Sequence, residues 1–454
     1  MASTHDLLLT TLAEQIGQHK KILVGFSGGL DSTVLLHLLV CLRTQSHQLS
    51  GERMVRMALR AIHIHHGLNS KADLWGEHCC QICADWQVDF RIEKVRLNTR
   101  QNGIEAAARN ARYHAFQQEL QKDEVLITAQ HLDDQAETFL LALKRGSGPA
   151  GLSSMPSRMP FAGTTLIRPL LNVSRAELEE YAQSQRLQWV EDDSNQDDRY
   201  DRNFLRLNIM PLLNQRWPHF PQAVSRSASL CGEQEQLLDE LLKESLNALI
   251  TLEGSISIPP LENSSEAKRN ALLRRWLNQC GVKMPAREQL QRIWSEVALA
   301  RQDAEPRFRL GQHDIRRYRQ QLWLVPQYQN LAGAIFAWDL RQELMLPDGL
   351  GTLCLSQEND IKENSIKVRM PNGHEQVTIR FGVQGNISIV GRQHSRHSKK
   401  LWQELGVAPW LRERTPLLYY NEKLIAALGV FITKAGQCLS DDERISVQWK
   451  KVTF

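Results

Sequence analysis

Hydrophobic positions in the first half of the chain form short strand-like runs, and longer amphipathic segments separate them. Residues 22–26, 58–65, 90–95 and 125–128 have the length and composition of strands, and the second run alternates regularly between apolar and polar side chains. The segments between them have the composition of helices. Strands that alternate with helices along a chain are typical of α/β proteins. We therefore expect a Rossmann-like α/β domain with a parallel sheet.

The pattern changes in the second half, where helical spacing comes first and alternation returns later. Leucines recur at helical spacing at 237, 238, 241 and 242, and residues 267–277 combine an apolar with a basic face. Strand-like alternation is found at 308–310, 322–325, 377–381 and 387–390. The sequence thus predicts a mainly helical middle domain with a small β element, and then an α+β domain.

Prolines and glycines mark the expected domain boundaries. Pro218 and Pro221 close a helical stretch after the α/β part, and Gly349 and Gly351 precede the last part. A chain of 454 residues is long enough for about three domains. We place them at residues 1–220, 221–335 and 345–454.

Composition and charge limit the class of protein. No run approaches the ~20 apolar residues of a membrane span, and the first residues lack the basic start and cleavage pattern of a secretory signal. The eight cysteines follow no regular framework, which indicates reduced thiols and a cytoplasmic location. A net charge of +4 is too small to indicate a nucleic-acid partner by itself.

The strongest chemical signal is a loop between the first predicted strand and the helix after it. The loop reads Ser27-Gly28-Gly29-Leu30-Asp31-Ser32. Two adjacent glycines let the backbone approach a phosphate, and the helix presents free N–H groups to the anion. No lysine is present as in the P-loop consensus, which disfavours transfer of a γ-phosphate. The Asp31 carboxylate is suited to holding Mg²⁺ against phosphates.

A second signal follows the fourth predicted strand, at residues 129–138. His131 and Asp133 should lie at the carboxyl end of that strand, where α/β folds bind ligands. Asp134 and Glu137 are three residues apart on the helix that follows, so their carboxylates should lie together and suit an ammonium group. The structural alternative is that Asp133 or Asp134 only caps the helix.

Two arginines lie on an alanine-rich helix predicted at 103–113. Arg109 and Arg112 are three residues apart and should share one face. Together they can grip a triphosphate or an adenylate and supply the positive charge that the glycine loop lacks. A solvated surface pair is the alternative.

Histidines and cysteines raise the question of a metal site. His63, His65 and His66 end the second strand, but alternation would send His66 to the opposite face from the other two. Cys80 and Cys83 form a single CxxC on a predicted helix, and no second CxxC completes a zinc or iron–sulfur site. We interpret the cysteines as a helix face, and a metal site at the histidines as the minority alternative.

The glycine loop resembles the SGGxDS signature of the PP-loop ATP pyrophosphatase superfamily, whose members split ATP between the α- and β-phosphates and adenylate a substrate. Further motifs resemble those of the tRNA(Ile)-lysidine synthetases in the same order. They are HxHHGL at 63–68, ARxxRY at 108–113, AHHxDDQxET at 129–138 with Gln130 in place of a histidine, RGSG at 145–148, RPLL at 168–171, DxSN at 192–195, RNxxR at 202–206 and WxRxRxP at 410–416.

This resemblance implies a reaction. ATP, with Mg²⁺, would adenylate C2 of the wobble cytidine in the CAU anticodon of tRNA(Ile). The ε-amine of L-lysine would then displace AMP, which changes codon specificity from AUG to AUA and tRNA identity from methionine to isoleucine. The general base for the amine is not readable from the sequence, although His131 is a candidate by chemistry.

The resemblance also implies roles for residues. The catalytic residues would be Asp31, Arg109, His131 and Asp133, with Asp31 also the Mg²⁺ ligand. ATP would bind to Ser27, Gly28, Gly29, Leu30, Asp31, Ser32 and Arg112, and lysine to Asp134 and Glu137. Residues 391–402 carry four fixed positive charges and no acid, which suits an RNA backbone. The expected tRNA contacts are Arg145, Arg202, Arg206, Arg392, Arg396, Lys399, Lys400, Arg412 and Arg414.

Two other functions stay open. A PP-loop enzyme that thiolates tRNA cytidine would need catalytic cysteines, for which Cys80 and Cys83 are the candidates. An inactive PP-loop protein would bind tRNA without consuming ATP. The sequence also leaves open whether a homodimer forms and which contacts reject elongator tRNA(Met).

Overall fold

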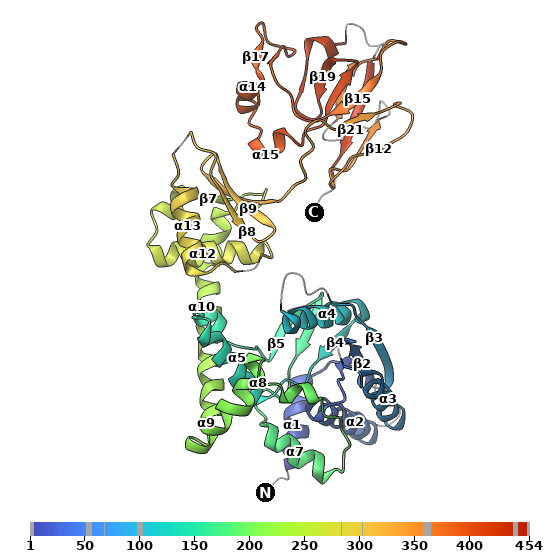
Figure 1. Cartoon of the computed structure of the whole chain (residues 1–454), viewed down its shortest axis with the longest axis vertical. Helices are drawn as coiled ribbons and strands as arrows, with labels where there is room; N and C mark the ends of the chain where they lie inside the picture. Colours follow the sequence, from blue (N-terminus) through green and yellow to red (C-terminus); the bar gives the residue numbers. More distant parts are fainter. Residues whose placement is uncertain are drawn as a thin grey trace. The chain divides into compact units, whose positions relative to one another are not determined.

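The computed structural model describes residues 4–50, 57–67, 69–97, 103–282, 284–301, 303–356, 365–438 and 444–451. The chain divides into two compact units, Met1–Leu241 and Leu242–Phe454 (Figure 1). Helix α10 (Phe220–Leu249) includes the boundary between them, and the three domains expected from the sequence stay a prediction. In the described ranges no helix is long and apolar enough to cross a membrane. Leu68, the last residue of the HxHHGL motif, lies outside these ranges.

A six-stranded sheet forms the centre of the first unit (Figure 1). Its strands are β1 (Lys21–Gly25), β2 (Ala58–His65), β3 (Asp89–Lys94), β4 (Glu124–Ile127), β5 (Arg158–Phe161) and β6 (Thr164–Ile167). They lie in the order β3-β2-β1-β4-β6-β5, and every neighbouring pair is parallel except β5 with β6. The chain changes direction across the sheet between β1 and β4, so the loops after these strands meet at a switch point, where α/β folds bind ligands.

Helices cover both faces of this sheet, which confirms the expected α/β fold. One face packs on α1 (Thr4–Ile16), α2 (Leu30–Ser50), α3 (Ala72–Asp85) and α7 (Arg175–Ser184), and the other on α4 (Ile104–Glu119). Strand β1 shows why both faces are apolar. Ile22 and Val24 are buried in the larger cluster, whereas Leu23 between them is buried with Phe116 of α4.

A tight hairpin forms one edge of the sheet. Ala162 and Gly163 join β5 to β6, and both have positive φ, 48° and 78°, which matches the twist of an antiparallel pair. Pro160 lies in the outer strand β5, opposite Thr165, a position that tolerates a residue without an N–H group. The sequence pattern did not predict this hairpin, because each strand has only four residues and one contains proline.

The remaining helices of the first unit follow β4 and α7. They are α5 (Leu132–Lys144), α6 (Pro149–Leu152), η2 (Asp193–Gln196), α8 (Asp201–Phe204), η3 (Leu205–Ile209) and α9 (Met210–Arg216). Ala136 of α5, Met210 of α9 and Val224 of α10 are buried in one small cluster. This packing places the segment 201–209 beside the amino-terminal turns of α5.

The second unit begins with a helical part that a small sheet completes, as the pattern predicted. Its elements are β7 (Ile256–Ser257), α11 (Pro259–Glu262), α12 (Glu266–Gln279), α13 (Arg287–Arg292), η4 (Ile293–Ala298), β8 (Arg307–Leu310), β9 (His313–Tyr318) and β10 (Gln321–Pro326). The strands lie antiparallel in the order β7-β10-β9-β8. Leu273, Trp276 and Ile293 are buried at its centre.

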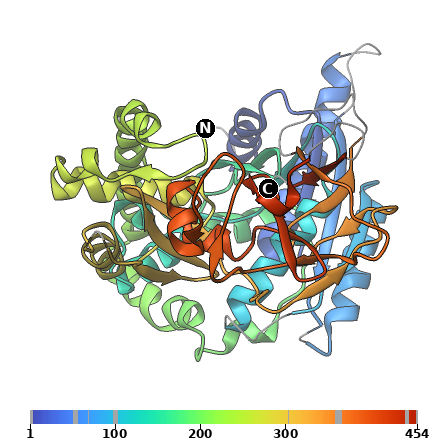
Figure 2. The same cartoon turned by 90° about the horizontal axis from the view of Figure 1, so that it is seen from above.

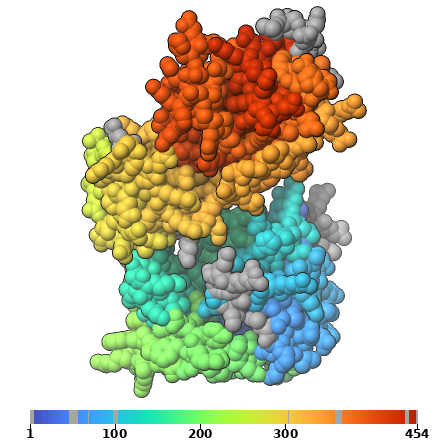
Figure 3. Space-filling view, turned by 45° about the horizontal axis from the view of Figure 1, so that its top comes forward, coloured from blue at the N-terminus to red at the C-terminus, as the bar shows by residue number. Residues whose placement is uncertain are grey.

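The rest of the second unit is rich in β-structure (Figure 2), and Figure 3 shows its surface in orange and red. Its elements are β11 (Ile335–Ala337), β12 (Leu344–Met345), β13 (Thr352–Leu355), β14 (Ser365–Arg369), β15 (Val377–Arg380), β16 (Asn386–Ile387), β17 (Arg396–His397), α14 (Ser398–Glu404), α15 (Pro409–Arg412), β18 (Leu417–Tyr420), β19 (Lys423–Ala427), β20 (Phe431–Ile432), η5 (Lys434–Gly436) and β21 (Arg444–Lys450). The two larger sheets have the orders β11-β15-β18-β19-β20 and β12-β13-β21-β14. This confirms an α+β end of the chain.

Candidate active site at the carboxyl edge of the first sheet

The glycine loop after β1 is held in place by α3 and by the segment after α7. Gly28 has a φ of 81°, and a Cβ on it would lie 2.7 Å from Cys79 Sγ. The Val190 N–H donates to the Gly28 carbonyl oxygen at 2.9 Å. The hydroxyl oxygens of Ser27 and Ser32 lie 3.0 Å apart. The strand, loop and helix context required of a phosphate-binding loop is therefore present, while ATP binding by residues 27–32 stays a prediction.

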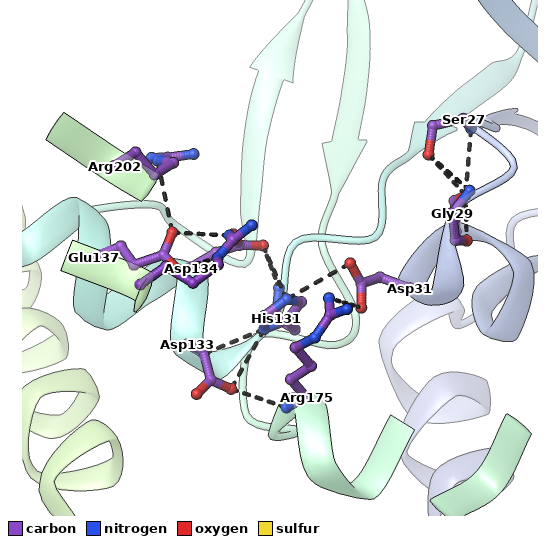
Figure 4. A network of polar contacts seen from close by, with 11 residues as sticks. Ser27, Gly29, Asp31, His131, Asp133, Asp134, Glu137, Arg175 and Arg202 are labelled. Carbon is purple, nitrogen blue, oxygen red and sulfur yellow. Dashed lines mark hydrogen bonds and ion pairs between the residues drawn. The ribbon is translucent and has the colours of Figure 1, made fainter. Parts of the chain in front are cut away.

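His131 lies next to this loop, at the N-cap of α5, and three carboxylates surround it (Figure 4). Its Nε2 lies 3.6 Å from Asp31 Oδ2 and 3.5 Å from Asp134 Oδ2, and its Nδ1 lies 3.5 Å from Asp133 Oδ2. The side chain is only 1% exposed. The structure thus brings together four of the residues singled out in the sequence, from the start of α2 and the start of α5.

The charge of His131 decides what it can do. Burial alone would lower its pKa, but the carboxylates of Asp134, Asp133 and Asp31 outweigh burial and raise the pKa to about 9. The Asp133 N–H also lies 3.2 Å from Nδ1, a contact that suits a neutral ring. With three carboxylates within 3.6 Å, we take the imidazolium as the neutral-pH form. An imidazolium cannot accept a proton, which argues against the suggestion that His131 is the general base.

Arg175 completes this cluster, and the sequence analysis did not single it out. Its backbone N–H donates to Asp133 Oδ2 at 2.8 Å, and its Nη1 lies 3.5 Å from Asp31 Oδ1. Ser174 and Glu177 have the spacing of a capping box, a pattern that predicts the start of a helix, and the structure has this box at the start of α7. An arginine in the first turn of a helix opposes the helix dipole. That misplaced charge was the available signal that carboxylates would lie nearby.

Asp31 is the residue that could hold a divalent cation. Burial raises the pKa of its carboxyl, although His131 and Arg175 oppose that shift. The carboxylate is 29% exposed at the end of the glycine loop. One carboxylate beside bound phosphate oxygens is the kind of ligand set that Mg²⁺ uses in nucleotide sites, so the residues present fit the ion.

The carboxylate pair expected to bind lysine already has protein partners. Arg206 forms a bidentate pair with Glu137, through Nε to Oε1 at 2.7 Å and Nη2 to Oε2 at 3.0 Å. The same Nη2 lies 3.1 Å from Asp134 Oδ1. Arg202 Nε lies 3.7 Å from Glu137 Oε2, and its Nη2 donates to Thr138 Oγ1 at 2.9 Å. Arg202 and Arg206, which we expected on tRNA, are engaged here because the segment 201–209 packs on α5.

Arg109 and Arg112 differ in their surroundings. Arg109 is exposed, and its guanidinium lies 5.0 Å from the centre of the Tyr113 ring. Arg112 is partly buried, has no ion-pair partner in the described part of the chain, and burial lowers its pKa, as do the nearby charges of Arg109 and Arg202. Burial and Arg112 also lower the pKa of His66 to about 4, and no partner meets its buried Nδ1. A bound anion would give the Arg112 guanidinium and the His66 ring a polar partner.

The histidines and cysteines singled out in the sequence do not gather at one site. His63 Nδ1 lies 3.1 Å from the Phe26 carbonyl oxygen and 3.6 Å from Cys79 Sγ, beneath the glycine loop. Cys83 is buried and Cys80 is exposed, so the CxxC pair does not face one site. Burial raises the pKa of Cys79 and of Cys83 to about 12. Within the described ranges no three histidine, cysteine or acidic side chains gather in a way that could hold a metal ion.

The other basic residues expected on tRNA fall into three groups. Arg145, Lys399 and Lys400 are exposed, and this leaves their predicted role open. Arg392 and Arg396 also lie at the surface, but both pair with Glu404 of α14. The cluster at 391–402 is therefore less positive than its own sequence indicated, because the acid comes from just beyond it.

Arg412 and Arg414 lie in structural positions. Arg412 Nε donates to the Val407 carbonyl oxygen at 2.9 Å. Arg414 is 7% exposed, pairs with Asp348 and lies 3.7 Å from the centre of the Tyr328 ring. These contacts enclose the Arg414 guanidinium within the second unit and give it a structural role, and its predicted contact with tRNA stays a prediction without support from this position.

Comparisons with known proteins agree along the chain. Residues 3–213 match the PP-loop domain family, residues 256–323 the TilS substrate binding domain and residues 377–449 the TilS substrate C-terminal domain. The tRNA(Ile)-lysidine synthase of Photorhabdus laumondii is 66% identical over 451 residues, which cover 99% of each chain. That of Proteus mirabilis is 56% identical over 444 residues, 98% of each chain.

A solved structure gives only a distant likeness. The U34-tRNA thiolase NcsA from Methanococcus maripaludis with its [4Fe-4S] cluster has a TM-score of 0.41 and 17% identity, and the likeness covers 50% of this chain and 80% of that chain.

Proposed function

Because the chain belongs to the tRNA(Ile)-lysidine synthase family, we propose that the side chains around His131 carry out the two chemical steps of lysidine formation. The enzyme is an ATP-dependent ligase that forms a carbon–nitrogen bond on tRNA. The observation that carries the residue assignment is one continuous network of polar contacts. It runs from Asp31 at the glycine loop through His131 and Asp134 to Arg206 and Glu137 (Figure 4).

In the first step, the C2 carbonyl oxygen of the wobble cytidine attacks the α-phosphate of ATP, and pyrophosphate leaves. Residues 27–32 would hold the departing pyrophosphate through backbone N–H groups and serine hydroxyls. Arg112, which is partly buried and forms no close ion pair within the described residues, would pair with phosphate oxygens from the other side. Mg²⁺, when bound beside Asp31, would neutralise phosphate charge.

The charges around His131 support a role in this step. Its Nε2 lies 3.6 Å from the Asp31 carboxylate at the start of α2. From this position the imidazolium can stabilise negative charge that develops on the α-phosphate. Asp133 and Arg175 would fix the position of the ring and of Asp31. His131 would thus act as an electrostatic group and not as a base.

In the second step, the ε-amine of lysine attacks C2, and the bond from C2 to the AMP oxygen breaks. Adenylation has turned that oxygen into part of a good leaving group, and binding holds the amine close to the carbon. Asp134 and Glu137 would position the amine. The product pairs with A in place of G, so the tRNA then reads AUA and carries isoleucine identity.

Recognition of tRNA(Ile) with its CAU anticodon would draw on exposed basic residues. Arg145 caps the carboxyl end of α5 in the first unit, and Lys399 and Lys400 lie on α14 of the second unit. Phosphate contacts from such residues give affinity that falls steeply with salt.

The test is incorporation of labelled lysine into tRNA(Ile) with a CAU anticodon, with ATP and Mg²⁺, together with release of AMP and pyrophosphate. Omission of ATP and replacement of lysine by other amino acids are the controls. Asp31→Asn should abolish adenylation, whereas Glu137→Gln should allow adenylation and block lysine transfer. If the wild-type protein binds this tRNA but does not incorporate lysine, the proposal is contradicted.

A further inference from the structure

The carboxylate pair at the proposed lysine site has no oxygen without a protein donor. Arg206 faces Glu137 Oε1 and Oε2, and it also faces Asp134 Oδ1. The remaining oxygen, Asp134 Oδ2, accepts from the His131 backbone N–H at 3.2 Å and lies 3.5 Å from His131 Nε2. An amine that enters here must share oxygens with a guanidinium that is already in place.

The guanidinium is firmly held. Glu137 is 1% exposed and Asp134 14% exposed, so their pairs with Arg206 are shielded from solvent. Two parallel N–H···O contacts from one guanidinium to one carboxylate are the strong form of such a pair. Because a single amine nitrogen lacks the planar fork that makes these parallel contacts, displacement of Arg206 by the incoming amine is costly. We therefore expect lysine to bind beside Arg206 and not in its place.

A lysine ammonium at this position would meet a charge balance that disfavours it. Asp134 and Glu137 supply two negative charges, and Arg206 and Arg202 supply two positive charges within 3.7 Å of them. A second cation next to the Arg206 guanidinium is repelled, more strongly in a buried site than in water. A neutral amine has no such penalty and can still donate hydrogen bonds to carboxylate oxygens.

Charged groups from the other elements around the pair do not reverse this balance. His131 and Asp133 belong to α5 itself, Asp31 comes from α2, and Arg175 comes from α7. Arg112 of α4 adds positive charge near Arg202. Outside the Asp134 and Glu137 pair, the negative charges of Asp31 and Asp133 are therefore balanced by the positive charges of Arg175 and His131.

We propose that Arg206 is a positioning residue that keeps the amine of bound lysine in its neutral, nucleophilic form. The inference rests on the proposed function, because it takes lysine to bind at Asp134 and Glu137. The ammonium gives up one proton to solvent as it binds. The amine lone pair then forms the bond to C2, the C2–O bond to AMP breaks, and the nitrogen releases a second proton to solvent.

The test is the pH dependence of the lysine step alone. Enzyme is allowed to adenylate the tRNA with ATP, labelled lysine is then mixed in, and single-turnover rates are measured between about pH 6.5 and 9.5. For Arg206→Gln, we expect the acid limb to move up by at least about one pH unit, with a loss of about tenfold or more near pH 7 that shrinks at high pH. Arg206→Lys keeps the charge and should have an acid limb close to that of the wild type.

A matched control removes an arginine charge just before the segment 201–209. Arg199 pairs with Asp197 and is 85% exposed, so Arg199→Gln should leave the acid limb where it is. If Arg206→Gln slows the step by the same factor at every pH, Arg206 only holds the segment 201–209 on α5, and the inference is wrong.

A second measurement needs no variant and protects the test against a misfolded one. In the wild-type enzyme, the acid limb should lie at least about one unit below the value near 10.4 for a lysine amine in water. Replacing lysine by 4-thialysine, whose amine is less basic, should lower the limb further if the limb belongs to the substrate. A limb that ignores this change, or one near 10.4, overturns the inference. Absence of lysine incorporation at every pH would instead overturn the proposed function.

Discussion

The backbone N–H of Val190 donates a hydrogen bond of 2.9 Å to the carbonyl oxygen of Gly28. Val190 lies just before the DxSN motif, 162 positions along the chain from the glycine loop by its residue number. Its segment is fixed in turn by Lys71, whose Nζ lies 2.6 Å from Asp193 Oδ2. The conformation of the loop therefore depends on parts of the chain that no local motif connects to it.

The first prediction concerns the packing under the loop. Gly28→Ala should lower the free energy of unfolding by about 2–4 kcal/mol, because the residue has a φ of 81° and its new Cβ would lie 2.7 Å from Cys79 Sγ. The KM for ATP should rise as the loop shifts. Thermal or denaturant unfolding and ATP-dependent adenylation would measure the two effects.

Gly29→Ala is the matched control for Gly28. Its Cβ would meet nothing closer than 3.6 Å, so its stability should stay near that of the wild type even if phosphate binding suffers. Cys79→Ala should restore part of the stability of Gly28→Ala, since it removes the overlapping sulfur. If both glycine variants are equally stable, the argument from packing fails.

The second prediction compares two uncharged residues at position 131, one that can cap α5 and one that cannot. His131→Asn can accept the Asp133 N–H but carries no charge, whereas His131→Ala does neither. We expect the Asn variant to be more stable than the Ala variant by about 1 kcal/mol. Both should lose about 10²-fold or more in adenylation rate, because the charge near the α-phosphate is gone. Adenylation at the wild-type rate in His131→Asn would contradict the proposed role.

The third prediction concerns the thiols and the thiolation alternative. Burial raises the pKa of Cys79 and Cys83 to about 12, so both stay protonated and enclosed at pH 8, whereas Cys80 is exposed. A short pulse of iodoacetamide on the native protein, followed by mass spectrometry, should label Cys80 and spare the other two. Cys80→Ser should leave lysine incorporation unchanged. If the variant no longer incorporates lysine, a function for the CxxC pair must be considered again.

The fourth prediction separates structural from RNA-binding basic residues. Arg414→Ala should destabilise the second unit by about 3–5 kcal/mol, because it leaves the negative charge of the Asp348 carboxylate without its positive partner. Lys399→Gln and Lys400→Gln should change stability by no more than about 0.5 kcal/mol. If the lysine contacts a phosphate, each variant should reduce the slope of the logarithm of the tRNA binding constant against the logarithm of salt concentration by somewhat less than one unit. An unchanged slope in both lysine variants would remove α14 from the proposed RNA surface.

Local patterns predicted much of the fold in this chain. Alternation placed a strand at 58–65, where β2 lies, and the capping box at Ser174 placed the start of α7. Such features depend on neighbouring residues, which the sequence displays directly. The β5–β6 hairpin was missed because its strands are too short for periodicity to emerge.

Residue roles were harder to predict where opposite charges meet across long separations. His131 lies close in the sequence to Asp133 and Asp134, so the motif predicted that these side chains lie together, whereas Asp31 comes from the glycine loop. Glu137 with Arg206 and Asp348 with Arg414 are 69 and 66 positions apart, so an arginine that looked free for RNA was already neutralised. Nothing in the composition of a basic segment tells which distant acid will fold against it.

The proline in β5 has a consequence for association between copies. Strand edges recruit other strands through their unpaired N–H and C=O groups, and Pro160 removes a donor from the outer strand of this sheet. A continuous sheet that joins two molecules through β5 would have a gap in its ladder at this position. A dimer of this enzyme is therefore not expected to form by strand pairing at β5, which acts as a terminus for the sheet.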